Sequence, residues 1–242
     1  MRFQNQKMDL IDFFNLAINA IISGEHDLFE VVNLSLYVSC SAVVIASLIG
    51  VPLGGYLATS RFKGRSVVII LVNALMGLPP VVVGLMIYLL LSRSGPFGVF
   101  GLLYTPTAMI IAQAVLITPI ITALTRQTVE HLSRDYDQQL QLFGISPMKR
   151  MMTLIVDGRF ELVTAVLAGL GRAMAEVGAV MIVGGNIDHF TRVMTTTITL
   201  ETSRGNLALA LALGMILIVM TILINAAMAG LRWWGEKRYG HG

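Results

Sequence analysis

Five runs of apolar residues follow one another along the chain, each long enough to cross a membrane as a helix. A crossing helix needs about 20 apolar residues, and these runs contain almost no charged residues. They cover residues 32–58, 67–91, 104–124, 162–183 and 207–231. The pattern predicts an all-α, polytopic membrane protein with about five transmembrane helices, formed by a single transmembrane domain over residues 30–233.

A weaker amphipathic pattern precedes the first run, within the segment 1–29. Polar residues recur three or four positions apart, so they form one stripe on a helix; they are Asp9, Asp12, Asn15, Asn19 and Ser23. This pattern favours a helix that lies in the membrane interface, with a sixth, weak span as the alternative. The N-terminus lacks a compact apolar core followed by a cleavage site, so no cleavable signal peptide is expected.

Lysine and arginine are distributed unevenly between the two sides of the predicted spans. Eleven lie on one side: Arg61, Lys63, Arg65, Arg126, Arg134, Lys149, Arg150, Arg159, Arg232, Lys237 and Arg238. The other side has Arg2, Lys7, Arg93, Arg192 and Arg204. The positive-inside rule places the larger group in the cytoplasm. We therefore expect an outside N-terminus, a cytoplasmic insert at about 126–160 and a cytoplasmic tail over 234–242, with Trp233 and Trp234 as an interfacial anchor.

Composition agrees with a membrane protein. Hydrophobic residues make up 55% of the 242 residues and charged residues 13%, whereas a soluble domain has about a quarter charged residues. The excess of lysine and arginine over acidic residues is explained by the orientation of the spans in the membrane, so no nucleic-acid partner is expected. The one cysteine, Cys40, lies in an apolar run, and we expect it to be a buried, unreactive thiol.

The insert between the third and fourth runs differs from the rest of the chain. It contains "QLQLFGISPMKRMMTLIV", residues 139–156, and predicts two short helices. Residues 135–143 would form the first, Gly144 would end it, and Ser146 would cap a second helix with Pro147 at its first position. Apolar residues at this corner either bind a protein partner or pack on the chain's own helix ends; they are Leu140, Phe143, Ile145 and Met148.

Motifs for catalysis are missing. The chain has no phosphate-binding loop, and its histidines, which all fall outside the runs, are His26, His131, His189 and His241. The runs contain no series of acidic residues or histidines that would form a proton relay. We expect no enzyme activity, so a pump of this kind would take its energy from another chain or from an ion gradient.

The fourth run contains the motif "GRAMAEVGAV", residues 171–180. Arg172 and Glu176 are one helical turn apart, and Arg172 is about 16 Å past Glu161, near the middle of the membrane. The pair is either a polar element of a translocation route or an ion pair that holds helices together. The small residues around it permit close helix packing and suggest a second copy of the chain; they are Gly169, Gly171, Ala173, Ala175, Gly178 and Ala179.

Two further segments carry candidate features. Pro79 and Pro80 in the second run remove two backbone donors and predict a kinked or broken helix, which lines a cavity or is only structural. The segment 184–206 is rich in hydroxyl groups, which suit an oxyanion but are also typical of an exposed loop, the expectation for most of them. The hydroxyl-bearing residues are Thr191, Thr195, Thr196, Thr197, Thr199, Thr202 and Ser203.

Together, the insert, "GLPPVVVG" and "GRAMAEVGAV" resemble the permease subunits of type I ABC importers, in particular the molybdate and tungstate branch. The resemblance runs from about residue 35 to the end of the fifth run, and "TTTITLETSRGNLALALALG" is most similar to the tungstate permeases. The family signature is Glu-Ala-Ala, three residues, Gly, nine residues and Ile-x-Leu-Pro. Gly144 is kept, but the other positions differ; they are Gln138, Gln139, Leu140, Leu154, Val156 and Asp157.

The resemblance implies a machine in the bacterial or archaeal cytoplasmic (inner) membrane. It would contain two copies of this chain, two ATP-binding subunits and an extracytoplasmic oxyanion-binding protein. ATP and Mg would bind the partner ATPase, with no cofactor on this chain. The chain would conduct tungstate, or else molybdate, by alternating access. The alternatives to an ATP-driven importer subunit are a gradient-driven transporter or channel and a non-transporting membrane scaffold.

The resemblance also implies roles for particular residues. Pathway candidates are Pro79, Pro80, Arg172 and Glu176. The insert would be the coupling element that docks on the ATPase, through Gln138, Gln139, Leu140, Phe143, Gly144, Ile145, Ser146 and Pro147.

Overall fold

The computed structural model describes residue 18, residues 26–142 and residues 146–239. The described part is helical and contains no strand. Its elements are α2 (His26–Thr59), α3 (Arg65–Met76), α4 (Pro80–Leu91), η1 (Gly98–Phe100), α5 (Pro106–Leu142), α6 (Pro147–Asp157), α7 (Arg159–Met174), α8 (Gly178–Gly184), α9 (Met194–Arg204) and α10 (Leu207–Tyr239). The predicted interfacial helix before α2 lies outside the described residues, apart from Ile18.

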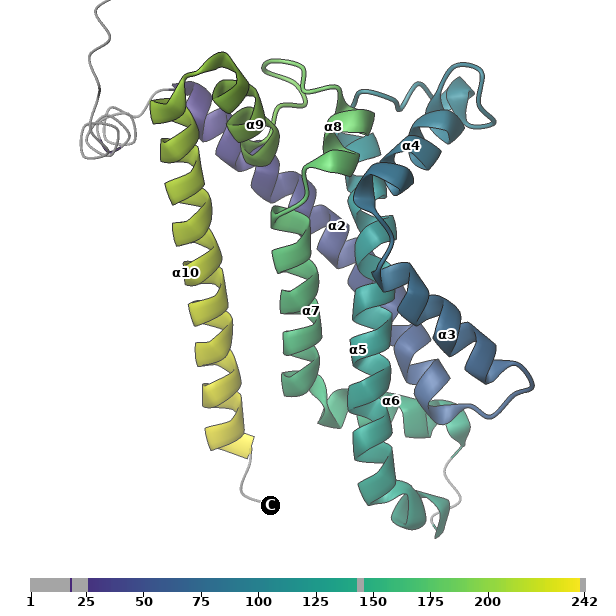
Figure 1. The fold of residues 1–242 in the computed structure, drawn as a ribbon. Helices are drawn as coiled ribbons and strands as arrows, with labels where there is room; N and C mark the ends of the chain where they lie inside the picture. Colours follow the sequence, from purple (N-terminus) through teal and green to yellow (C-terminus); the bar gives the residue numbers. More distant parts are fainter. Residues whose placement is uncertain (1–17, 19–25, 143–145, 240–242) are drawn as a thin grey trace, which may run out of the picture.

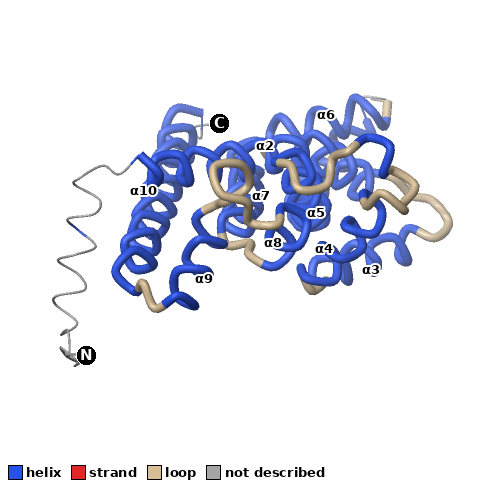
Figure 2. Tube along the Cα trace, turned by 90° about the horizontal axis from the view of Figure 1, so that it is seen from above, coloured by secondary structure: helices blue, strands red, loops and turns tan. Residues whose placement is uncertain are grey.

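Within the described residues, three helices are each long and apolar enough to cross a membrane, in α2, α5 and α10. Two bent pairs, α3 with α4 and α7 with α8, bring the number to five when each pair counts as one span. Figure 1 shows α5 and α10 running between the two ends of the molecule, with the shorter α7 between them and α2 crossing behind. Figure 2 shows α10 and α3 on opposite sides of this bundle. The prediction of about five spans is confirmed.

The break between α3 and α4 follows from its two prolines. α3 ends at Met76, and α4 begins at Pro80 after a bend of 100°. Pro79 is the N-cap residue with an extended backbone, and Pro80 occupies the first helical position, where its missing N–H leaves no hydrogen bond unmade. The predicted broken helix is confirmed.

A second break, between α7 and α8, was not predicted. The expectation of one continuous helix over 162–183 is wrong, because α7 ends at Met174 and α8 begins at Gly178, with a bend of 59°. The carboxylate Oε1 of Glu176 accepts a hydrogen bond from the N–H of Ala179 at 3.0 Å. This side chain takes the place of a backbone acceptor and starts a new helix.

The predicted separate helix over 135–143 is also wrong. α5 is one helix of 37 residues that continues past the apolar run to Leu142, because nothing between the run and Gly144 interrupts it. The start of α6 agrees with the prediction: Ser146 is the N-cap residue and Pro147 occupies the first turn, although the Ser146 hydroxyl makes no capping bond.

The main hydrophobic core joins α2, α4, α5, α7 and α8. At the crossing of α2 and α5, a β-carbon on Gly54 would lie 2.5 Å from the carbonyl oxygen of Thr122, so only glycine permits this approach. A smaller cluster joins α2, α9 and α10 through Leu28, Met194 and Leu213. α10 lies at the edge of the bundle, because only 17% of its most apolar stretch is buried inside the chain.

Cys40 is exposed on the single chain, so the expectation of a buried thiol is wrong. The sequence places Cys40 in a span, but the side of α2 that carries it points away from the core of this chain.

Candidate translocation site and coupling surface

The two helix breaks lie next to each other in space. A β-carbon on Gly178, at the start of α8, would lie 2.8 Å from Cγ2 of Val81 in the first turn of α4. A β-carbon on Gly84 would lie 2.7 Å from the Cα of Ala179. α4 and α8 thus pack backbone to backbone just beyond Pro79–Pro80 and Glu176, and the sequence-predicted pathway residues belong to one region.

Glu176 is buried between the broken helix ends, with 3% of its side chain exposed. Its Oε2 lies 3.4 Å from Nη2 of Arg172, and its backbone carbonyl accepts a hydrogen bond from the Thr195 hydroxyl at 2.8 Å. Arg172 itself, in the last turn of α7, is 37% exposed. The acid is therefore held inside the chain, while its basic partner points to the outside of it.

A small cavity adjoins this break. Gln113 of α5 donates from Nε2 to the carbonyl oxygen of Ala173 at 3.1 Å, where α7 is ending. The cavity has a volume of about 10 Å³, which is room for about one water molecule. Its lining includes Ser35, Ser39, Gln113, Glu176 and Thr195. Among the described residues, Oε1 of Gln113 and Oε2 of Glu176 have no hydrogen-bond partner. The break is thus a polar point inside an apolar bundle.

The segment after α8 forms a hydrogen-bonded unit at the opposite end from α6 (Figure 1). Four threonines in it are buried: Thr191, Thr195, Thr196 and Thr197. The expectation that most of these hydroxyls belong to an exposed loop is wrong for those four. Thr199, Thr202 and Ser203 are exposed as expected, but they lie in a helix and not in a loop. The difference arises because residues 194–204 form α9, whose inner face packs on the α7–α8 break.

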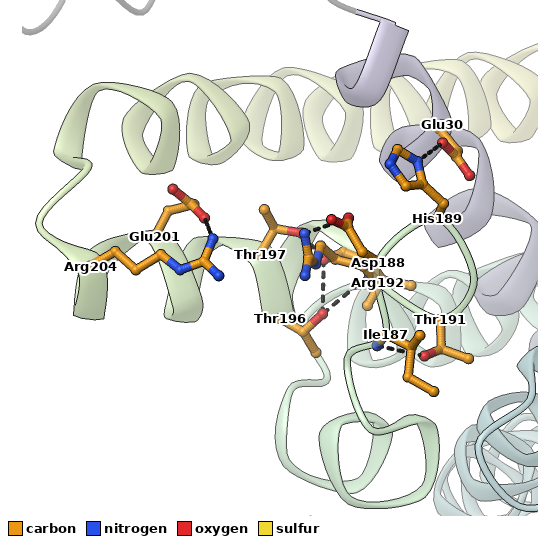
Figure 3. Close-up of polar contacts among 11 residues, drawn as sticks. Glu30, Ile187, Asp188, His189, Thr191, Arg192, Thr196, Thr197, Glu201 and Arg204 are labelled. Carbon is orange, nitrogen blue, oxygen red and sulfur yellow. Dashed lines mark hydrogen bonds and ion pairs between the residues drawn. The ribbon is translucent and has the colours of Figure 1, made fainter.

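Polar contacts fix the outer surface of this unit (Figure 3). His189 lies 2.8 Å from Glu30 of α2, and Arg192 contacts Asp188. The Thr191 hydroxyl accepts a hydrogen bond from the N–H of Ile187 at 2.9 Å. The His189–Glu30 contact connects the α8–α9 segment to the start of α2, and the other two contacts hold the segment's own turn together.

At the other end of the molecule, α6 lies crosswise behind α5 and leads to the start of α7 (Figure 1). It has two apolar sides. Met151 and Leu154 are buried, and a β-carbon on Gly55 of α2 would meet Ile155 and Met151. Met148, Met152 and Val156, spaced four apart and therefore on one face, are exposed. We call these three residues the outer α6 stripe. One side of α6 therefore packs on the chain's own helices, and the outer α6 stripe faces outward.

The remaining residues of the predicted coupling element are placed only in part. Gln138, Gln139 and Leu140 belong to the last two turns of α5, and Ser146 and Pro147 begin α6. Phe143, Gly144 and Ile145 lie outside the described residues.

The family model described as "Binding-protein-dependent transport system inner membrane component" matches residues 50–237. The chain belongs to this family. Its members are multi-pass permease subunits in the inner membrane, which work with an ATP-binding subunit and a substrate-binding protein. The chain is accordingly a transport subunit, and ATP hydrolysis takes place on the partner ATPase.

Several curated relatives cover almost the whole chain. A probable anion ABC transporter permease protein of Haloferax volcanii is 39% identical, over 89% of this chain and 95% of the relative. Tungstate uptake system permease proteins TupB of Peptoclostridium acidaminophilum and Campylobacter jejuni are each 37% identical, over 90% and 89% of this chain and 96% and 90% of the relatives. The resemblance to ABC importer permeases is confirmed.

Proposed function

We propose that this chain is the membrane subunit of an ATP-driven importer that conducts tungstate from an external binding protein to the cytoplasm, with molybdate as the next candidate. The support for tungstate is the higher similarity to the tungstate permeases. A sulfate permease of Salmonella typhimurium and a putative molybdenum permease of Bacillus subtilis are only 24% and 25% identical.

The observation that carries a pathway role is the unequal exposure of Arg172 and Glu176. An ionisable side chain near the middle of a membrane faces a bundle interior or a water-filled path. Glu176 faces the interior of this chain, whereas the guanidinium of Arg172 is partly exposed on it. Arg172 would therefore face the path of the substrate between subunits and attract a dianion. Glu176 would hold the guanidinium in place and start α8.

For coupling, the outer α6 stripe supports a docking surface for the ATPase. Three exposed apolar side chains at the end of the molecule that carries the basic loops need a protein partner. With that end in the cytoplasm, as the charge distribution indicates, α10 runs toward the cytoplasmic side. Force on α6 reaches Gly55 of α2 through Met151 and Ile155 and α7 through Gly158.

Two copies of the chain would form the conducting unit. The small-residue surface that suggested this is mostly used within the chain: Gly169 packs on Ile117 and Ile121, and Gly178 on Val81. Gly171 has no neighbour within 4 Å of an added β-carbon. It lies next to Arg172, so this exposed part of α7 is where a second copy would complete the path.

Transport by the purified complex tests the proposal. The permease, its ATPase and its binding protein are reconstituted in liposomes, with ATP enclosed on the ATPase side, and uptake of tungstate, molybdate and sulfate is measured. We expect tungstate uptake that requires ATP and persists with ionophores. Uptake without ATP that ionophores abolish would indicate a gradient-driven transporter, and no uptake of any anion would indicate a scaffold.

A further inference from the structure

A large basic pocket lies at the α6 end of the molecule, away from the translocation site. Its volume is about 730 Å³, within the range of ligand pockets in proteins. The α2–α3 loop, α3, α5 and α6 contribute one arginine each, and the four are Arg61, Arg65, Arg134 and Arg150. We call it the arginine pocket.

Basic residues outnumber acidic residues among the described residues of the arginine pocket. Among the described residues that line the pocket, four are arginines and one, Glu130, is acidic, so these residues carry a net charge of +3. That carboxylate is already shared, because it pairs with Arg65 and also with Arg126 at 2.6 Å. Arg150 donates to the Ser133 hydroxyl at 2.8 Å. Arg61 and Arg134 form no ion pair with any described residue, and both are exposed.

The pocket also has a fixed shape. Nε of Arg65 donates to the carbonyl oxygen of Leu57 at 2.7 Å, which ties the start of α3 to the end of α2. Tyr56 and Phe62 stack with ring centroids 5.9 Å apart and form an aromatic side of the same pocket. Planar guanidinium groups around a space of this size, two of them held in place, are suited to bidentate binding of phosphate-like oxyanions.

The neighbouring surface is apolar. None of the residues of α3 is buried, and its exposed side chains include Val67, Val68, Ile70 and Leu71. A surface of this kind, in a spanning segment, faces lipid chains. The arginine pocket thus lies where the lipid-facing surface of α3 meets the basic membrane boundary, and such pockets between transmembrane helices bind acidic lipid headgroups.

The pocket does not coincide with the outer α6 stripe. Arg150 is two positions from both Met148 and Met152, which is about 200° of helical rotation. A ligand at Arg150 and a protein docked on the stripe therefore approach α6 from different sides.

We propose that the arginine pocket binds a tetrahedral oxyanion group, either the phosphate of an anionic phospholipid or a free oxyanion of the cytoplasm. Arg61 and Arg134, which form no ion pair with a described residue, supply exposed positive charge, and Arg65 and Arg150 are held in place by Leu57, Glu130 and Ser133. The inference goes beyond the proposed function, because it requires no particular transported anion.

The test compares the purified permease–ATPase complex with its Arg61→Gln, Arg134→Gln double variant. The matched control is Lys63→Gln, Lys149→Gln, which removes the same charge at the same end, from exposed residues that do not line the pocket. In the first arm, delipidated complex is titrated with phosphatidylglycerol or phosphatidylcholine and bound lipid is counted by native mass spectrometry. In the second arm, the lipid-free complex is titrated with inorganic phosphate and with tungstate by calorimetry.

For a lipid headgroup, we expect phosphatidylglycerol to bind in preference to phosphatidylcholine. The double variant would bind it about 30-fold more weakly, since each arginine near an anionic surface contributes about fivefold, while the control binds normally. For a free oxyanion, the second arm would show binding that the double variant loses. Equal binding of phosphatidylglycerol by the double variant and the control, together with no anion binding that depends on Arg61 and Arg134, would overturn the proposal. Recovery of the ATPase with each variant shows that the complex is assembled.

Discussion

Gly84 of α4 lies so close to α8 that a β-carbon on it would be 2.7 Å from the Cα of Ala179. Backbone, unlike the end of a flexible side chain, cannot move aside cheaply at such a contact. The two broken helices are therefore connected at one rigid point, and a movement of either one is transmitted to the other.

Replacing Gly84 by alanine should force α4 and α8 apart. Overpacking of this kind costs about 1–3 kcal/mol, so we expect Gly84→Ala to lower the thermal midpoint of the purified complex and to reduce uptake. Gly214→Ala in α10 is the matched control, because an added β-carbon there meets nothing within 4 Å beyond its own helix backbone and chain neighbours and alanine favours the helix. If the two variants had equal midpoints, the close contact between α4 and α8 would be refuted.

Variants of Arg172 and Glu176 separate a pathway role from a structural ion pair. Arg172→Gln leaves the buried carboxylate of Glu176 without its partner and should destabilise the complex by about 1–3 kcal/mol. The double variant Arg172→Gln, Glu176→Gln should regain stability, because the glutamine carbonyl still accepts from the N–H of Ala179. We expect its uptake of the anion to stay low. Normal uptake by the stable double variant would reduce the pair to a structural role.

The outer α6 stripe can be tested by adding a charge. Met152→Glu should prevent docking of the ATPase, because a carboxylate would be buried in an apolar contact, while the permease itself remains folded. Thr153→Glu adds the same charge on an exposed neighbour, about 100° away around the helix, and should have little effect. Co-purification of the ATPase measures docking, and equal recovery with both variants would place the docking surface elsewhere.

Thr195 should stabilise the α7–α8 break. Its buried hydroxyl donates to the carbonyl oxygen of Glu176 at 2.8 Å, so Thr195→Val should cost about 1–2 kcal/mol by leaving that carbonyl unpaired. Thr202 makes only a bond within its own helix, to Ile198, and is exposed; Thr202→Val should change the free energy of unfolding by less than about 0.5 kcal/mol. Chemical unfolding of both variants measures the difference.

The sequence predicts those features that local chemistry determines. Two adjacent prolines have no backbone donors, so the break at Pro79–Pro80 is visible in the sequence. Ser146 followed by Pro147 is a typical helix start, and α6 begins there. The apolar runs similarly define the spans, because membrane thickness sets their length.

Features that depend on distant contacts could not be predicted. The break at Glu176 contacts Thr195, which is 19 residues away in the chain, and Gly178 just beyond it packs on Val81 of α4. The burial of Thr195 and Thr196 depends on how α9 folds back on the break. Arg61, Arg65, Arg134 and Arg150 indicate orientation when they are read along the chain, and only the fold reveals that they line one pocket.

The most direct test of the account is cellular tungsten and molybdenum, measured by mass spectrometry in cells with and without this chain at low supplied oxyanion. The account predicts that loss of the chain removes tungsten accumulation and that the intact gene restores it. If molybdenum accumulation were lost as well, the chain would belong to an importer that carries both oxyanions. Unchanged levels of both metals would contradict the claim that this subunit imports these anions.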